Sequence, residues 1–146
     1  MSILDKLNDK QREAAAKIEG ALLILAGAGS GKTRTITYRI AHMIDEIGIS
    51  PYKILAVTFT NKAAKEMKER VESLVGEDAK RVMISTFHSF GLRLLRVYGD
   101  RLGYNANFTI YDTDDQKRVA KNIMKDLVVK DKSLKEGLVA SIILYY

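Results

Sequence analysis

The strongest constraint on the fold of this chain is a glycine-rich turn that directly follows an apolar run. The run "ALLILA" occupies residues 21–26, and "GAGSGKT" continues it to Thr33. Short apolar runs are typical of strands buried on both faces, and glycines allow the backbone to turn tightly towards a helix. The pattern therefore predicts a strand, a loop and a helix in direct succession.

The same alternation repeats along the chain. Further apolar runs, "KILAVTF" at 53–59 and "RVMISTF" at 81–87, favour strands, and we expect the first of these, like 21–26, to be buried on both faces. Helical patterns cover 8–20, 32–46, 61–75 and 86–99. Strands that alternate with helices predict an α/β fold with a parallel sheet and flanking helices.

Three loops leave the carboxyl ends of these strands, at 26–33, 58–61 and 85–89. Because the carboxyl ends of parallel strands meet at one edge of a sheet, we expect the loops to face a common ligand surface. Beyond Gly103 the pattern changes to a short extended piece, an acidic helix start at Asp112 and a lysine-rich helix. The parallel sheet is therefore expected to end before that point.

Composition excludes several kinds of protein. The 146 residues include no cysteine and two histidines, so any metal is expected to bind mainly oxygen ligands. No apolar stretch approaches the roughly 20 residues of a membrane span, and we expect a soluble, cytoplasmic protein without a membrane partner. The formal charge of +6 favours a polyanionic partner without identifying it.

Residues 26–33 match the P-loop pattern G-x-x-x-x-G-K-[ST] at every position except the first, where Ala26 replaces glycine. In such a loop, backbone N–H groups and the start of the helix converge on phosphate oxygens. Lys32 is then expected along the β- and γ-phosphates and the Thr33 hydroxyl on Mg²⁺, as the catalytic pair of the loop. We predict a nucleoside triphosphate site; the alternative is a glycine-rich turn without a ligand.

Polar and aromatic side chains gather at the other two loops. They are Phe59, Thr60 and Asn61 in the second loop and Thr86, Phe87 and His88 in the third. Aromatic rings beside hydroxyl and amide groups are typical of single-stranded nucleic-acid sites. Two alternatives stay open: Phe59 as a core aromatic, and Thr86 as an N-cap with Phe87 and Phe90 packed on one helix face. We expect His88 to form hydrogen bonds rather than to bind a metal.

Four stretches together resemble the N-terminal motifs of the UvrD/PcrA/Rep group of superfamily 1 DNA helicases. In chain order they are "LNDKQREA", "AGAGSGKT", "VTFTNKAAKEM" and "TFHSFGLRLLR", and the resemblance covers about residues 4–97. Ala26, which departs from the general P-loop pattern, is what this family usually has. The resemblance implies an ATPase that translocates along single-stranded DNA with 3′ to 5′ polarity and unwinds duplex DNA in repair or replication.

Carried over residue by residue, the resemblance implies two sets of binding residues. Gln11 matches the glutamine that reads adenine, although its position after Asn8 equally suits a capping box. The nucleotide set is Gln11, Ala26, Gly27, Ala28, Gly29, Ser30, Gly31, Lys32, Thr33 and Arg34. The DNA set is Phe59, Thr60, Asn61, Thr86, Phe87 and His88. ATP and Mg²⁺, the latter on Thr33, are the implied cofactors, and DNA and further motor domains are the implied partners.

The resemblance also implies a P-loop NTPase (RecA-like) sheet that is incomplete in this chain. Residues 1–110 match the N-terminal part of the first motor domain, and 111–146 match the start of an inserted helical subdomain. Hydrolysis in this family needs a carboxylate pair after another strand and arginines from a second motor domain. Asp45-Glu46 lies in a predicted helix, and the acidic residues at 112–115 suit a helix N-terminus. We therefore expect a truncated chain that does not hydrolyse ATP alone.

Other functions stay open. The helicase subunit of a recombination helicase-nuclease has similar N-terminal motifs, and a stand-alone module could bind nucleotide or single-stranded DNA without turnover. A small-molecule kinase shares the P-loop but has less use for an aromatic such as Phe59 at a neighbouring loop. For the parent protein, the resemblance implies a place in the bacterial cytosol, associated with the nucleoid.

Overall fold

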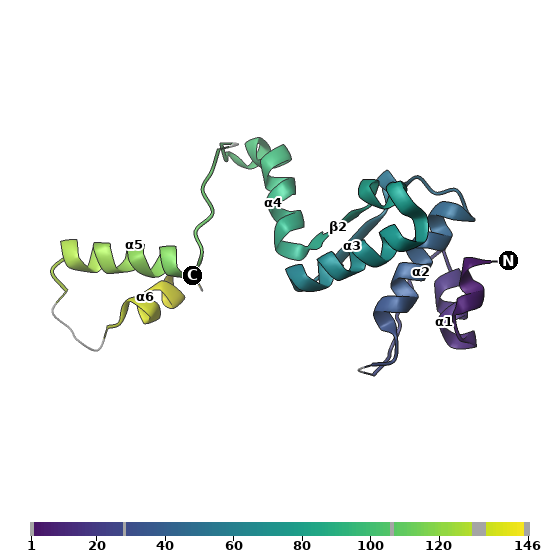
Figure 1. The fold of residues 1–146 in the computed structure, drawn as a ribbon. Helices are drawn as coiled ribbons and strands as arrows, with labels where there is room; N and C mark the ends of the chain where they lie inside the picture. The colour runs from purple at the N-terminus through teal and green to yellow at the C-terminus, as the bar shows by residue number, and fades with distance from the viewer. Residues whose placement is uncertain (1, 28, 106, 130–133, 145–146) are drawn as a thin grey trace. The chain divides into compact units, whose positions relative to one another are not determined.

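The structure, a computed structural model, describes residues 2–27, 29–105, 107–129 and 134–144, which fall into two compact units, 1–98 and 99–146 (Figure 1). The first unit contains η1 (Ile3–Lys6), α1 (Asp9–Ala16), α2 (Lys32–Asp45), η2 (Pro51–Lys53), β1 (Leu55–Thr58), α3 (Asn61–Val75), η3 (Gly76–Arg81), β2 (Met83–Thr86) and α4 (Phe87–Tyr98), where η marks a 3₁₀ helix. The second contains η4 (Gly99–Leu102), α5 (Thr113–Asp126) and α6 (Glu136–Leu144). The described residues thus form a mixed α/β fold, as the sequence predicts.

Side-chain caps fix helix starts at the predicted positions. The Asn8 side chain accepts a hydrogen bond from the backbone N–H of Gln11 at 2.9 Å, and the Gln11 side chain accepts one from the N–H of Asn8 at 3.3 Å. This capping box opens α1. Asp112 opens α5 by accepting from the N–H groups of Asp114 and Asp115, which confirms that this acidic group is a helix N-terminus.

The sheet of the first unit has two strands. β1 and β2 pair in parallel, with Leu55 opposite Met83 and Thr58 opposite Thr86. The carboxyl ends of the two strands therefore lie side by side, which confirms the prediction for the second and third loops. α3 forms the crossover between the strands and packs on both of them.

The main core lies among α2, α3 and the sheet. Its buried side chains are Ile40 and Ile44 from α2, Met67 and Val71 from α3, and Ile54, Ala79 and Val82 from the strand ends and η3. Burying one large side chain of this kind contributes about 1.5–3 kcal/mol. This core holds α2 against α3 and so fixes the direction in which α2 leaves the glycine-rich loop.

Two expectations about the strands are wrong. Residues 21–26 form no strand, and Leu23 and Leu25 are 80% and 85% exposed. β1 is not buried on both faces, since Leu55 is 47% exposed. A strand exists only where a neighbouring strand supplies hydrogen-bond partners, and within the described ranges only β1 and β2 pair. The loop at 26–33 therefore does not leave a strand end, and only the other two loops share an edge.

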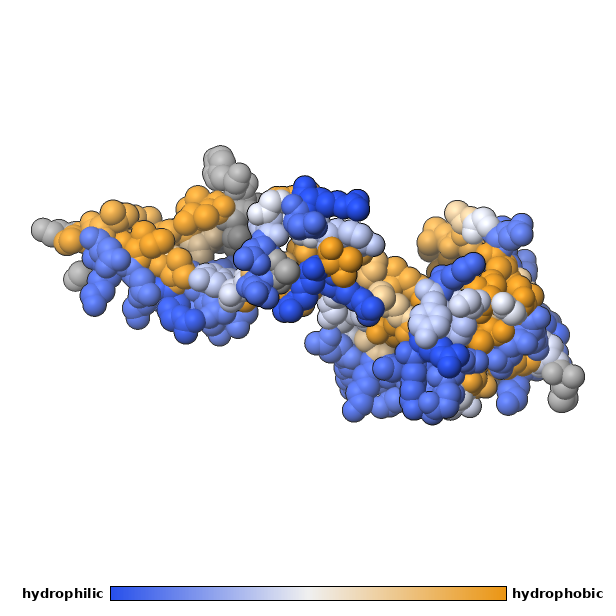
Figure 2. All heavy atoms as spheres, turned by 90° about the horizontal axis from the view of Figure 1, so that it is seen from above, coloured by the Kyte–Doolittle hydropathy of each residue, from blue (hydrophilic) through white to orange (hydrophobic). Residues whose placement is uncertain are grey.

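The second unit is helical in the residues that the structure describes. α5 and α6 pack against each other, and their apolar and polar side chains gather on opposite sides of this unit (Figure 2). The lysine-rich helix predicted after residue 112 is confirmed as α5. The domain boundary expected after residue 110 stays a prediction. No helix in the described part of the chain is long and apolar enough to cross a membrane.

Glu46, the C-cap residue of α2, binds the start of the chain. Its carboxylate accepts hydrogen bonds from the Ile3 N–H at 2.7 Å and the Ser2 hydroxyl at 2.9 Å, and lies 2.5 Å from Nδ1 of His42. The bond from Ile3 is the main cause that lowers the pKa of Glu46 below its ordinary value. Desolvation acts against this shift, whereas the bonds from His42 and Ser2 reinforce it.

This lowered pKa predicts a pH-dependent contribution to stability. Because Glu46 titrates at lower pH in the folded chain, its contribution is complete above the unfolded-state pKa, about 4.3, and is lost as the pH falls through the folded-state pKa. Glu46→Gln should therefore lower the thermal unfolding midpoint at neutral pH, and the difference from the unsubstituted chain should shrink under acid. Thermal unfolding followed by circular dichroism, from neutral to acidic pH, measures this difference.

The control for this experiment is Glu69→Gln. Glu69 is an exposed residue of α3 that lies 3.9 Å from Lys65, and exposed pairs of this kind contribute little. Its replacement should change the melting midpoint little at any pH. A difference between Glu46→Gln and the unsubstituted chain that stays constant down to acidic pH would contradict the role of the Glu46 carboxylate.

Candidate functional site

The start of α2 carries positive charge and no side-chain cap. Gly31 occupies the N-cap position with φ 85°, and no described side chain bonds to this end as a cap. Lys32 and Arg34 lie in the first turn, where no acidic residue offsets them. Since the first N–H groups of a helix and its dipole add positive partial charge, this end of α2 is suited to bind an anion.

Inside the loop, several donors point at one carbonyl. The oxygen of Gly27 accepts hydrogen bonds from the Ser30 hydroxyl at 2.7 Å and from Nζ of Lys32 at 2.6 Å, and Nζ also donates to the oxygen of Ala26 at 2.7 Å. The Lys32 ammonium is therefore folded over its own loop. An anion bound here would compete with these two carbonyls for the ammonium. Of the predicted loop residues, Ala28 lies outside the described residues.

Gln11 on α1 contacts the same loop. Its Nε2 donates to the backbone oxygen of Ser30 at 3.1 Å, while its Oε1 serves the capping box. A cavity of about 270 Å³ adjoins this contact. It is lined by Asn8, Lys10, Gln11, Ala14, Ile24, Leu25, Ala26, Ser30, Lys32 and Thr35. The structure thus brings Gln11, Ala26, Ser30 and Lys32 together around one cavity; the reading of adenine by Gln11 stays a prediction.

Thr33 offers one oxygen ligand for a metal at the loop. It is a half-buried residue in the first turn of α2. In the part of the chain that the structure describes, no group of three or more His, Cys, Asp or Glu could hold a metal ion. Mg²⁺ keeps several waters and is often bound through few protein oxygens together with substrate phosphates. The single hydroxyl of Thr33 fits that kind of site, not a cage made of protein ligands.

Arg34 points to the N-terminal segment. Its Nη2 donates to the oxygen of Lys6 at 2.8 Å, and its guanidinium lies 5.2 Å from the centre of the Tyr38 ring. It lines a different cavity, of about 280 Å³, together with Arg70 and Ser73. In this arrangement Arg34 is not among the residues that surround the cavity beside Gln11, so its contact with a nucleotide stays a prediction.

At the edge formed by the ends of β1 and β2, two aromatic rings meet. Phe59 and Phe87 have ring centroids 5.5 Å apart with planes inclined by 51°. Phe59 is 90% exposed and Phe87 is 52% exposed. Phe59 is therefore not a core aromatic in this structure. Two exposed rings at a strand edge form a surface on which flat apolar groups can stack.

The polar residues of this edge divide into capping and exposed groups. Thr60 accepts from the N–H of Ala63 and caps α3, and the buried Thr86 accepts from the N–H of Ser89 at the start of α4. Asn61 and His88 are exposed. The N-cap interpretation of Thr86 is thus confirmed, and the contacts of all these residues with DNA stay predictions.

Sequence reasoning missed Arg39. It lies on α2, half-buried, and its guanidinium donates to the backbone oxygens of Ala14 at 2.9 Å and Ile18 at 3.4 Å. These acceptors are carbonyls at the end of α1 and just beyond it, which any residue type carries. No sequence signal other than an arginine beside the apolar face of α2 could have indicated this contact.

Comparison with known proteins identifies relatives of the chain. A model of the UvrD/REP helicase N-terminal domain matches residues 7–143. The chain is 55% identical to the ATP-dependent DNA helicase PcrA of Staphylococcus epidermidis and 53% identical to that of Staphylococcus aureus, in both cases over 131 residues and 90% of the chain. It spans 18% of the length of these curated relatives. Since the family model covers most of the chain, the chain belongs to the UvrD/REP helicase family, in which it matches the N-terminal domain.

Proposed function

We propose that this chain is the ATP-binding, N-terminal part of an ATP-dependent DNA helicase of the UvrD/PcrA type. The observation that carries the proposal is the start of α2, where Gly31, Lys32 and the uncapped first turn form an anion-binding end next to Gln11. The loop sequence and the two-stranded parallel sheet support a P-loop NTPase fold of the RecA type. The relatives are named as ATP-dependent DNA helicases.

In this proposal the loop binds the nucleotide through its own residues. Lys32 leaves the carbonyls of Ala26 and Gly27 and donates to the β- and γ-phosphates, while the first N–H groups of α2 bind phosphate oxygens. Thr33 holds Mg²⁺, which, when bound, offsets the charge of the phosphates. Gln11 lies beside the cavity and binds the adenine base.

The exposed aromatic pair is the proposed contact with single-stranded DNA. Phe59 and Phe87 stack on bases, and Thr60, Asn61, Thr86 and His88 lie beside them at the same edge. Movement along DNA, with 3′ to 5′ polarity by resemblance, belongs to the whole helicase together with its further motor domains. We place that helicase in DNA repair or replication, in the cytosol and near the nucleoid.

The chain alone is proposed to bind ATP without hydrolysing it. The two acidic groups considered as candidates have other roles: Glu46, beside Asp45, binds Ser2, Ile3 and His42, and Asp112 caps α5. Within the described residues, none of these carboxylates is among those that line the cavity beside the loop. The test of the nucleotide site is the affinity of the chain for ATP, which Lys32→Ala must lower.

Phe59→Ala tests the DNA site. Stacking of one base on an aromatic ring contributes about 1–3 kcal/mol, so the substitution should weaken binding of a single-stranded oligonucleotide about tenfold. Fluorescence anisotropy with a labelled oligo-dT strand at low salt measures the affinity. Tyr52→Ala is the matched control, because Tyr52 on η2 is also an exposed aromatic, 76% exposed. Equal losses in both variants would show that Phe59 has no specific role.

A further inference from the structure

α1 is a short helix whose C-cap residue, Lys17, bonds to the carbonyl of Glu13. It ends at Ala16, its last turn has no basic residue, and the N–H of Lys17 bonds to the oxygen of Glu13 at 3.3 Å. Ala14 follows Glu13, and its carbonyl is one of the last four carbonyls of α1. These carbonyls have no N–H partner within the helix. Such carbonyls bond to water or to donors from elsewhere in the protein.

Arg39 of α2 supplies these donors. Its two terminal nitrogens donate to the oxygens of Ala14 and Ile18, so one planar group binds the last turn of α1 and the second residue beyond it. A guanidinium can do this because its N–H groups form a rigid fork, whereas a lysine ammonium is a single point. The positive charge also suits the negative end of the helix dipole.

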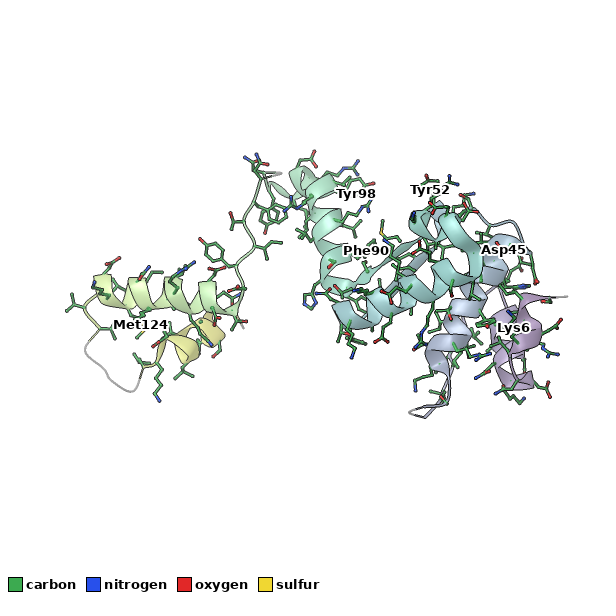
Figure 3. The ribbon with its side chains drawn as sticks, in the orientation of Figure 1. Lys6, Asp45, Tyr52, Phe90, Tyr98 and Met124 are labelled. Carbon is green, nitrogen blue, oxygen red and sulfur yellow. The ribbon has the colours of Figure 1, made fainter. Side chains whose placement is uncertain are left out.

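The same short helix carries Gln11, which contacts the glycine-rich loop. Gln11 and Ala14 are three residues apart, so they lie on the same side of α1. Arg39 follows Lys32 by seven residues on α2, about 10 Å along the helix axis. α1 is therefore attached to the loop at its first turn and to α2 at its last turn. Arg34, through the oxygen of Lys6, holds the residues before α1; Lys6 is labelled beside α2 in Figure 3.

The apolar anchor of α1 is small. Ala15 is the one fully buried side chain of the described helix, and it packs in a cluster with Leu4 and Leu7. A buried alanine contributes little because it removes little apolar area from water. Ile3 and, from α2, Tyr38 pack against this cluster, and the two hydrogen bonds from Arg39 add a directional attachment at the end of α1. The orientation of α1, and with it the position of Gln11, therefore depends in part on Arg39.

We propose that Arg39 is a positioning residue that holds α1 so that Gln11 meets the base of the bound nucleotide. This inference rests on the proposed nucleotide site. It requires that the loss of Arg39 acts through Gln11. The affinity for adenine nucleotides should then fall more than the affinity for other nucleotides, while the phosphate contacts of Lys32 persist.

The test compares ATP with GTP in four forms of the chain: unsubstituted, Arg39→Met, Gln11→Ala and the double variant. Arg39→Met should weaken ATP binding about fivefold to tenfold and GTP binding less, and Gln11→Ala should do the same. The double variant should bind ATP no more weakly than Gln11→Ala alone. The ATP affinity of Arg39→Lys should lie between the affinities of the unsubstituted chain and of Arg39→Met. Arg81→Met, which removes an arginine paired with Asp78 on η3, is the control and should change neither affinity.

A second measurement does not need a nucleotide. In the nucleotide-free chain, Arg39→Met should speed amide hydrogen exchange in residues 9–16 and leave residues 61–75 unchanged. Unchanged exchange in 9–16, equal losses of ATP and GTP affinity, or additive losses in the double variant would each overturn the role of Arg39. If the unsubstituted chain bound no nucleotide, the proposed function would fail, and with it the part of this role that concerns the base; the exchange result would still decide whether Arg39 holds α1.

Discussion

Lys32→Ala is expected to weaken binding of ATP to this chain about a hundredfold. Hydrogen bonds to charged groups contribute about 1.5–3 kcal/mol each, and a hundredfold loss corresponds to about 2.7 kcal/mol. The ammonium lies over the loop, 2.6 Å and 2.7 Å from the oxygens of Gly27 and Ala26, and in the proposed site it exchanges these carbonyls for phosphate oxygens. Isothermal titration calorimetry with ATP and Mg²⁺ measures the loss.

Two comparisons make this result specific to the phosphates. Adenosine lacks them, so its weak binding should be the same in the unsubstituted chain and in Lys32→Ala. Lys10→Ala removes another ammonium from the wall of the same cavity, but Lys10 pairs with Glu13 at 3.1 Å on the exposed side of α1, and its loss should have little effect. Equal effects of the two lysine substitutions would show that only net charge matters.

The same variant decides whether the chain alone hydrolyses ATP. We expect no turnover above background in either form. ATP hydrolysis that survives repurification of the unsubstituted chain and disappears in Lys32→Ala would contradict that expectation. It would also mean that residues of this chain orient the water that attacks the γ-phosphate, a role that the proposed function gives to none of them.

The helix starts could be predicted from the sequence because they depend on neighbouring residues. The capping box of Asn8 with Gln11, the cap of α4 by Thr86 and the cap of α5 by Asp112 each involve residues within three positions. The run at 21–26 could not be predicted in the same way. Its apolar residues favour a strand, but a strand also needs a paired neighbour, which lies far away in sequence or in another part of a protein.

The contacts of the candidate site also differ in whether the sequence could predict them. The meeting of Phe59 and Phe87 followed from parallel strands whose ends share an edge, a rule of topology that the sequence pattern carries. The hydrogen bonds of Arg34 to Lys6, of Arg39 to Ala14 and of Glu46 to Ile3 could not be derived, because these partners are backbone groups of the N-terminal segment. Backbone carbonyls and N–H groups have no residue-type signature. These contacts nevertheless attach the N-terminal segment, including the end of α1, to α2.

Gly31→Ala is expected to have the second large effect, on both stability and nucleotide binding. Gly31 has φ 85°, where a non-glycine residue costs about 1–2 kcal/mol, and a Cβ there would lie 2.6 Å from Nε2 of Gln11. Because Nε2 is the end of a flexible side chain, Gln11 moves away and its bond to the oxygen of Ser30 breaks. Stability should fall by about 2 kcal/mol in chemical denaturation, and ATP affinity by tenfold or more.

Gly29→Ala is the matched variant for this substitution. Gly29 has φ 76°, so alanine meets a similar backbone cost, but among the described residues other than its chain neighbours no atom lies within 4 Å of its Cβ position. Gly29→Ala should distort the loop and so lower the stability and the affinities for ATP and GTP. The ratio of the two affinities should stay the same. Gly31→Ala should in addition lose the preference for ATP over GTP, because Gln11 has left the loop. If both variants keep the ratio of the unsubstituted chain, the contact between Gln11 and the loop does not determine which base is bound.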